Sequence, residues 1–398
     1  MTSLSVRHLL IYFAARALPA LASMALTFLC IQMLPSDQYA LYSLTLLAAG
    51  VASGFVGGMS GQPMQRYSHQ LDLASLRRAL LQLPLGVAAV AVLIVSVYIS
   101  VTAGLSISAV LAIASIPLLA LVDARRNLFI ARGRASAVLA LDGWRSLLAL
   151  FFGGGLLWLW SEQAVAPLAA QLMGIVICLM VVSSRAADGP HGTRKLDRAY
   201  LHYGIGIAGW MAGITALALV ERSMLAAAMG LASSGQYAAQ SDVINAVFAA
   251  GSSMLASAMM PSYLAQTTRF DAKELRRLCR VGMLGCLAIA FMCLMAGVIL
   301  VLLPGIRVAR TLTADIPTAL TLIAAATVWS VAGFVQKPVE LRGQTYRLFF
   351  GVICSLILFL IIALPLVEHF SAQGIALAKL TSGGAYILYY AWIERNSK

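Results

Sequence analysis

Charged side chains are scarce in this sequence. They make up 11% of the 398 residues, whereas hydrophobic residues make up 61% and the mean hydropathy is +0.88. A water-soluble protein of this size could not cover its surface with polar groups at such a composition. The composition therefore excludes a soluble protein and predicts an all-α integral membrane protein with many spans.

Long polar segments, metal-binding cysteine spacings and a cleavable leader are also missing. No connection on the outer side exceeds about a dozen residues, which leaves no room there for a catalytic domain. The first apolar run begins near residue 9 without a small-residue cleavage site, so we interpret it as an uncleaved span. The six cysteines show no metal spacing, and those at 279, 286 and 293 indicate packing along one helix face. We expect no cofactor, no metal site and no enzymatic activity.

Twelve apolar runs are long enough to cross a bilayer, for which a helix needs roughly 20 residues. They lie at about 9–33, 38–62, 79–102, 107–130, 134–158, 163–183, 204–228, 236–260, 281–303, 316–336, 347–366 and 372–393. With the N-terminus in the cytoplasm, the inner segments hold twenty-two arginines and lysines, and the outer segments hold only Arg307 and Arg310. This asymmetry predicts that both termini are cytoplasmic. It also explains the net charge of +13, whose spread over short segments argues against a nucleic-acid partner.

A repeat divides the chain into two halves. The triplet Gln-Tyr-Ala ends the stretch 34–40 and recurs in 231–238 at an offset of 198, as do Pro63 and Pro261. The pattern Asp-x-x-x-Leu-Arg-Arg at residues 72–78 recurs at 271–277. Such duplication is common in secondary transporters. We predict two six-helix lobes, 1–195 and 196–398, joined by a linker within 184–203.

The segments after the two prolines allow two interpretations. Residues 72–78 and 271–277 could form short interfacial helices, with Asp271 and Glu274 as a capping box, or their arginines could serve topology alone. Small residues recur at 53–54 and 251–252, where close helix packing or space for a ligand would suit them.

Seven ionisable residues fall inside the predicted spans. Each costs on the order of 2.5 to 3.5 kcal/mol at a helix centre, so each should face protein or water. They are Arg16, Asp142, Arg145, Glu221, Arg222, Asp242 and Lys379.

The charges in the first half favour different roles. Asp142 and Arg145 are three residues apart and should neutralise one another on one helix face. Arg16 has no acidic residue on its own helix, and it either snorkels to the inner headgroups or faces a central cavity. Arg66, at the inner end of the second span, is where a phosphate from the inner leaflet would first arrive, although an arginine at this boundary needs no such role.

The charges in the second half lie close in depth. Glu221 and Arg222 precede the turn between the seventh and eighth spans, and Asp242 follows it at a similar distance. An Arg222–Asp242 bridge across the hairpin is one expectation. A polar site in which Glu221 or Asp242 takes up an ion or a proton is the other, and Lys379 fits either a structural or a functional role.

Several of these features together resemble a known family. The sequence Leu-Pro-x-x-Gln-Tyr-Ala-Leu-Tyr at 34–42, Arg66, the Glu221–Arg222 pair before 235–238, and residues 373–378 resemble the Wzx-type polysaccharide flippases of the multidrug/oligosaccharidyl-lipid/polysaccharide (MOP) superfamily. This sequence has Ser234 before Gly235, where the family usually shows a Val-Gly-x-Tyr-like turn.

The resemblance implies a fold and a function. It implies a V-shaped bundle of two pseudo-symmetric six-helix lobes in the bacterial inner membrane, whose cavity is lined chiefly by the first, second, seventh and eighth spans. The implied substrate is an undecaprenyl-pyrophosphate-linked oligosaccharide for O-antigen or exopolysaccharide synthesis, with membrane lipids, a polymerase and a chain-length regulator as partners. Candidate phosphate-binding residues are Arg16, Arg66 and Arg222, and candidates for ion coupling or a polar cavity are Glu221, Asp242 and Lys379.

Three alternatives stay open at this stage. A drug antiporter of the same superfamily would need an acid-centred site. A membrane glycosyltransferase or polymerase would need a long outer loop with catalytic residues. A major-facilitator transporter would carry Gly-x-x-x-Asp-Arg between its second and third spans, and that motif is missing from this sequence.

Overall fold

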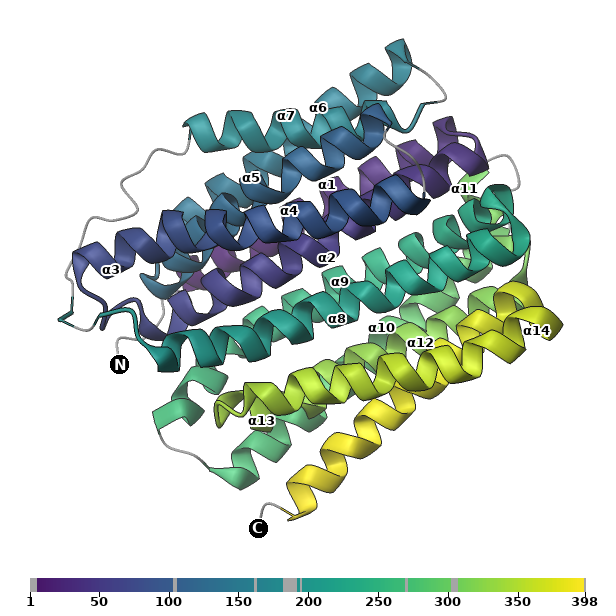
Figure 1. Cartoon of the computed structure of the whole chain (residues 1–398). Helices are drawn as coiled ribbons and strands as arrows, with labels where there is room; N and C mark the ends of the chain where they lie inside the picture. Colours follow the sequence, from purple (N-terminus) through teal and green to yellow (C-terminus); the bar gives the residue numbers. More distant parts are fainter. Residues whose placement is uncertain are drawn as a thin grey trace. The chain divides into compact units, whose positions relative to one another are not determined.

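A computed structural model describes residues 6–102, 106–160, 163–181, 192–193, 195–268, 271–301 and 307–396. The secondary-structure elements in this part of the chain are helices (Figure 1). The first half contains α1 (Val6–Met33), α2 (Ser36–Tyr67), α3 (Leu73–Arg77), the π-helical η1 (Arg78–Gln82), α4 (Leu83–Thr102), α5 (Ile107–Ala131), α6 (Ala135–Leu159) and α7 (Val165–Val181). The second half contains α8 (Arg198–Met229), α9 (Leu231–Thr268), α10 (Ala272–Val301), α11 (Arg307–Thr313), α12 (Ile316–Val335), α13 (Lys337–Leu341) and α14 (Thr345–Asn396).

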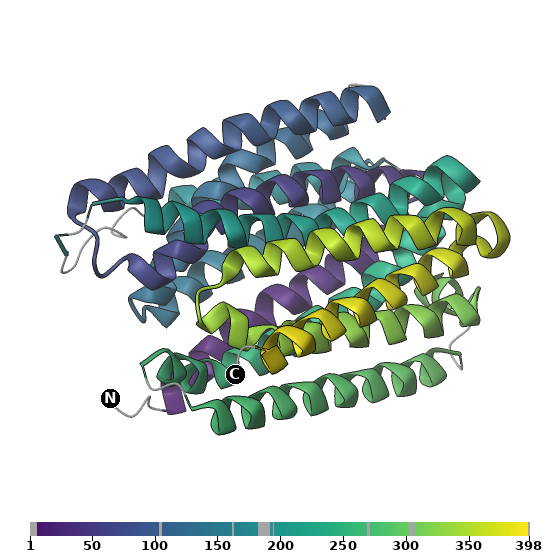
Figure 2. The same ribbon diagram turned by 60° about the horizontal axis from the view of Figure 1, so that its bottom comes forward.

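Helix α14 accounts for two of the predicted spans. Ser371 interrupts it with a φ of 51° and a ψ of −127°, and the chain reverses direction there, as Figures 1 and 2 show in yellow. The hydroxyl of Tyr390 donates to the carbonyl of Arg347 at 3.0 Å, which brings the two ends of α14 together. Each of the twelve predicted spans therefore falls on a helix.

Length and composition support membrane insertion. Within the described residues, eight helices are long and apolar enough to cross a membrane, and two shorter apolar segments, Ala17–Met33 and Val165–Val181, accompany them. Leucine, isoleucine and phenylalanine side chains are exposed along α4 and α10, as lipid-facing helices require. The expected all-α membrane fold is confirmed.

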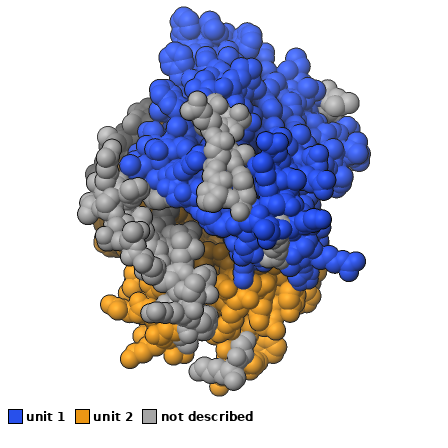
Figure 3. Space-filling view, turned by 90° about the vertical axis from the view of Figure 1, so that its left-hand side faces the viewer, with its two compact units in different colours: residues 1–22, 42–219 blue, residues 23–41, 220–398 orange. Residues whose placement is uncertain are grey.

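Contacts between Cα atoms divide the chain into two compact units. Unit 1 comprises residues 1–22 with 42–219, and unit 2 comprises residues 23–41 with 220–398 (Figure 3). The chain passes from one unit to the other within α1, within α2 and again within α8. The predicted lobes 1–195 and 196–398 stay a prediction, and residues 184–191 and 194 of the predicted linker lie outside the described residues.

Each of the two Asp-x-x-x-Leu-Arg-Arg segments begins a long helix. The first forms α3, which continues without a break through η1 into α4, and Asp72 caps it by accepting the backbone N–H of Ser75 at 2.6 Å, which lowers the pKa of the Asp72 carboxyl. The second forms no separate helix, because it is the first turn of α10. Asp271 accepts the backbone N–H groups of Lys273 and Glu274 there, at 2.8 and 3.3 Å. Neither copy thus forms the separate short helix that was one of the two expectations, whereas the capping role of Asp271 is confirmed.

Glycines permit close helix packing inside each unit. A Cβ atom at Gly58 of α2 would overlap the backbone of Ala208 in α8, and one at Gly251 of α9 would lie 2.6 Å from Ile289 of α10. Gly54, one turn before Gly58, also faces the α8 backbone, at 3.5 Å from Met211. Gly54 and Gly251 therefore serve close packing, whereas Ser252 lines a cavity described below.

Alanine at position 58 should destabilise unit 1. The added methyl group has no space against the α8 backbone, and such overpacking costs about 1–3 kcal/mol. Gly86→Ala is the matched control, because no atom lies within 4 Å of a Cβ at that position of α4. Thermal unfolding in detergent should give a lower midpoint for Gly58→Ala alone. Equal midpoints for the two variants would contradict the observed helix contact.

Candidate functional site: a buried charge network in unit 2

Glu221 and Arg222 are adjacent on α8, and both are buried, with exposed fractions of 0% and 2%. Neighbouring residues on an α-helix point about 100° apart, because one turn takes 3.6 residues. The two side chains therefore meet different helices of unit 2. An unpaired charge buried in this way would cost several kcal/mol, so the partners decide how the site is built.

Glu221 pairs with Lys379 of α14. The Lys379 Nζ atom lies 3.0 Å from Oε2 and 3.3 Å from Oε1 of Glu221. Trp329 of α12 donates its indole N–H to the backbone carbonyl of Lys379 at 3.2 Å, and this contact holds α14 against α12 at Lys379. The Tyr237 hydroxyl also interacts electrostatically with Glu221. The sequence analysis singled out both charged residues but did not pair them.

Arg222 pairs with Asp242 of α9. Its Nη2 atom bonds Oδ1 of Asp242, and its Nη1 atom donates to Oδ2 at 3.3 Å, which gives a two-point contact. The hydroxyl of Tyr39 donates to the same Oδ2 at 2.8 Å, and Ser234 donates its hydroxyl to the Arg222 carbonyl at 3.1 Å. The predicted bridge across the hairpin is confirmed.

Both copies of the Gln-Tyr-Ala repeat contribute to this network. Tyr39 belongs to the first copy, and its hydroxyl contacts Asp242 of α9. Tyr237 belongs to the second copy, and its hydroxyl interacts with Glu221 of α8. The copies also touch, because a Cβ atom at Gly235 would overlap the carbonyl oxygen of Ser36. Sequence reasoning missed Tyr39 as a site residue, although the offset of 198 from Tyr237 could have indicated it.

A cavity of about 450 Å³ in unit 2 lies beside Lys379. Helices α9 and α12, α13 and the second part of α14 supply its lining, which includes Lys337, Lys379, Asn245 and Trp329. Several serines, among them Ser252 and Ser253, complete its polar wall, and no carboxylate occurs among the described residues that line it. Both lysines have acidic partners outside the lining, since Lys337 binds Glu340 at 2.7 Å and Lys379 binds Glu221. The described cavity wall is mostly apolar, and its polar part consists of the two paired ammonium groups, the Asn245 amide and serine hydroxyls.

The remaining predicted residues lie in unit 1. Arg66 is exposed at the end of α2, and its guanidinium lies 5.1 Å from the ring centroid of Tyr203 and 5.7 Å from that of Tyr67. Arg16 belongs to α1, but its side chain lies outside the description.

The predicted pair between Asp142 and Arg145 is wrong. No ion pair joins them in the described part of α6, where Asp142 is buried and its Oδ1 atom lacks a hydrogen-bond partner. Arg126 of the neighbouring α5 pairs with Asp123 of its own helix at 3.2 Å and also interacts electrostatically with Asp142. Spacing along α6 alone could not reveal these surroundings.

Comparisons with known proteins identify the fold. No protein-family model matches the chain, and no curated protein sequence matches it. Among solved structures, a MATE protein in complex with MaD5 aligns with a TM-score of 0.65 at 14% identity, covering 98% of this chain and 94% of its own. A MOP superfamily transporter from Pyrococcus furiosus aligns with a TM-score of 0.63 at 13% identity, with coverage of 98% and 94%. An inward-facing multidrug resistance MATE family transporter gives 0.63 at 13%, with 98% of each chain covered. The chain has the fold of these transporters, along nearly its whole length.

Proposed function

We propose that this protein flips an undecaprenyl-pyrophosphate-linked oligosaccharide from the inner to the outer leaflet of the bacterial inner membrane. The observation that carries the proposal is the cavity beside Lys379, whose lining holds two lysines and no carboxylate among the described residues. A diphosphate is anionic, and ammonium groups with hydroxyl donors suit it, whereas a cationic drug requires an acidic wall. The fold is that of membrane transporters, which supports transport rather than catalysis.

The charge network suggests how phosphate binding and movement are linked. Glu221 joins α8 to α14 through Lys379, and Arg222 joins α8 to α9 through Asp242. A phosphate that approaches Lys379 competes with Glu221 for its ammonium group. Protonation of Glu221 would free Lys379 for this contact, so a proton is a candidate coupling ion. A ligand that favours one arrangement of the ion pairs shifts the population toward it.

The arginines take complementary roles in this proposal. Arg66 is exposed at the end of α2 and meets the diphosphate first from the inner leaflet. Arg16 and Arg222 hold it at different depths, and Arg222 does so only when Asp242 releases its guanidinium. Glu221 and Asp242 therefore act as internal competitors of the substrate phosphate.

A small-molecule antiporter is the second candidate. The fold likeness to multidrug resistance MATE transporters favours it, and so does the burial of the Glu221 carboxyl. Such an antiporter would exchange a cation for a proton or sodium ion at Glu221 or Asp242.

Deletion of the gene distinguishes the two functions. We expect loss of surface polysaccharide and accumulation of its lipid-linked precursor, measured by extraction and mass spectrometry, with unchanged sensitivity to cationic drugs. Complementation with Lys337→Met should restore export only in part, because the cavity loses one ammonium group, whereas Arg395→Met, an exposed change at the C-terminal end of α14, should restore it fully. Normal polysaccharide together with increased drug sensitivity would instead establish the antiporter.

A further inference from the structure

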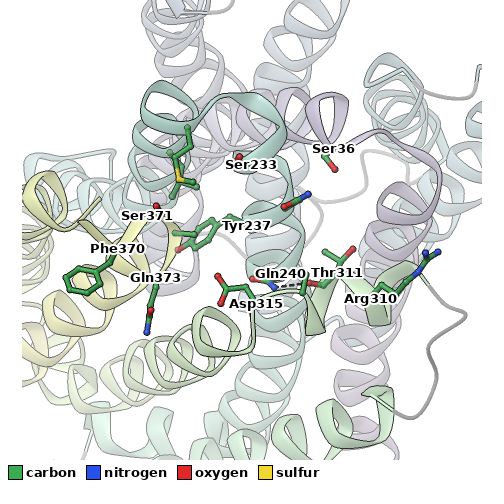
Figure 4. A pocket seen from close by; sticks show the side chains of 15 residues that line it. Ser36, Ser233, Tyr237, Gln240, Arg310, Thr311, Asp315, Phe370, Ser371 and Gln373 are labelled. Carbon is green, nitrogen blue, oxygen red and sulfur yellow. Dashed lines mark hydrogen bonds between the residues drawn. The ribbon is translucent and has the colours of Figure 1, made fainter. Parts of the chain in front are cut away.

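Unit 2 contains another cavity, of about 540 Å³. It lies at the helix ends that the distribution of arginines and lysines in the sequence predicts to be on the outer side of the membrane. The α8–α9 hairpin, helix α11 and the turn of α14 around Ser371 surround it (Figure 4). Its volume falls within the range of roughly 300–1,000 Å³ that is typical of small-molecule sites. None of the six predicted site residues lines it.

Some polar side chains of this cavity hold its wall together. Gln240 of α9 donates to the carbonyl of Thr311 in α11 at 2.8 Å, the dashed line in Figure 4. Asp315 caps α12, because its carboxylate accepts the backbone N–H of Thr318 at 3.1 Å and the Thr318 hydroxyl at 2.6 Å. The first hydrogen bond joins α9 to α11 at the cavity. The Asp315 carboxylate is already hydrogen-bonded to the first turn of α12.

Other polar side chains of the lining remain available to a ligand. Gln236, Gln373 and Ser233 form no side-chain hydrogen bond within the described part of the chain. The Tyr237 hydroxyl is not among them, because it is buried and interacts with the Glu221 carboxyl. Each amide offers two donors and one acceptor. The amides of Gln236 and Gln373 are therefore the donors and acceptors that a bound molecule would engage.

An apolar surface adjoins these polar groups. Phe370 precedes the turn at Ser371, its side chain is 54% exposed, and Leu225 and Met229 of α8 also line the cavity. The positive φ of Ser371 reverses α14 so that Phe370 and Gln373 border the same space (Figure 4). The cavity thus combines uncharged donors and acceptors with an exposed aromatic ring. A pyranose ring has the matching chemistry, with hydroxyl groups at its edge and an apolar C–H face.

We infer that this cavity binds a sugar unit of the transported headgroup at the outer end of its path. The inference rests on the proposed function. A site that hydrogen-bonds ligand hydroxyls through amides and hydroxyls strongly rejects analogues that lack those hydroxyls. The ligand class is a neutral hydroxyl-rich sugar rather than a phosphate, because the side chains without hydrogen-bond partners are uncharged and the described lining holds one arginine, Arg310, and one aspartate, Asp315, so it carries no net charge.

Direct sugar binding tests the inference. The full-length protein in nanodiscs is titrated with glucose, galactose, mannose and N-acetylglucosamine, and saturation-transfer NMR detects binding. We expect at least one sugar to bind, Gln373→Leu to weaken it about tenfold or more, and Gln82→Leu, an exposed glutamine of η1 in unit 1, to leave it unchanged. Gln236→Leu, on the exposed start of α9, replaces Gln373→Leu if that variant does not fold.

Three results would overturn the site: no sugar binds, the glutamine variants bind as wild type, or inorganic phosphate displaces the sugar. The gene deletion separates this outcome from failure of the proposed function. Sugar binding with normal surface polysaccharide after deletion would refute the flippase and keep the site. Loss of polysaccharide after deletion without any sugar binding would keep the flippase and refute the site.

Discussion

Replacement of Lys379 by methionine is expected to destabilise the protein by about 3–5 kcal/mol, because it leaves a buried carboxylate without its partner. Glu221 is fully buried and Lys379 is 8% exposed at its side chain, so water cannot compensate either charge. The midpoint of thermal unfolding in detergent, followed by the loss of monodisperse protein, measures this effect. Methionine keeps a similar volume, which separates lost charge from lost packing.

A double variant isolates the ion pair. Lys379→Met combined with Glu221→Leu removes both charges, and we expect it to regain most of the lost stability, since apolar replacements of a buried pair are often neutral or better. Lys337→Met is the matched control, because the Lys337–Glu340 pair is 23% exposed on each side and such pairs contribute about 0–1 kcal/mol. A double variant as unstable as the single one would mean that packing, not charge, explains the loss.

The same double variant separates stability from transport. If the Glu221–Lys379 pair served the fold alone, the restored variant would export polysaccharide at the wild-type level. We expect it to fold and to fail in export, because the cavity then lacks the Lys379 ammonium group.

Apolar runs predicted the helices because the bilayer dictates their length. The gap between the predicted spans 347–366 and 372–393 coincides with the break at Ser371, even though the backbone stays nearly helical on both sides. The Arg222–Asp242 bridge was also predictable, since the connection from α8 to α9 is a single residue, Gly230 with a φ of 83°. Arg222 lies eight residues before this turn and Asp242 twelve residues after it, so the two differ in depth by only about one helical turn.

Contacts between distant helices were not predictable from spacing. Glu221 and Lys379 are 158 residues apart, and Tyr39 and Asp242 are 203 apart. The prediction of an Asp142–Arg145 pair failed as well, because a spacing of three residues allows an ion pair on one helix but does not fix the directions in which the two side chains point. Sequence identifies which charges need partners, whereas packing decides which partners they receive.

The two acids of the network differ in their exposure, which suggests different roles. Glu221 is sealed by Lys379 and Tyr237, while the Asp242 side chain is 27% exposed and accepts hydrogen bonds from both Arg222 and Tyr39. Asp242 can therefore exchange its partners with solvent or substrate more readily than Glu221 can. Arg222 is the cation that this exchange would release toward a phosphate.

A charge swap tests that role of Arg222. Arg222→Asp combined with Asp242→Arg keeps an ion pair between α8 and α9 but moves the guanidinium from one helix to the other. We expect the swapped protein to fold, with Tyr39 then accepting from the arginine, and to lose export roughly 10- to 150-fold. A hydrogen bond to a charged group contributes about 1.5–3 kcal/mol, and each 1.4 kcal/mol is tenfold.

Export is measured by complementation of the deletion strain, with the membrane content of each variant determined by immunoblotting. Tyr39→Phe is the matched control, because it removes one hydrogen bond to Asp242 and leaves the guanidinium of Arg222 in place. Its export should stay near the wild-type level. If the swapped variant exports as well as the control, Arg222 holds α8 to α9 and takes no part in phosphate binding, since an ion pair in either orientation would then suffice.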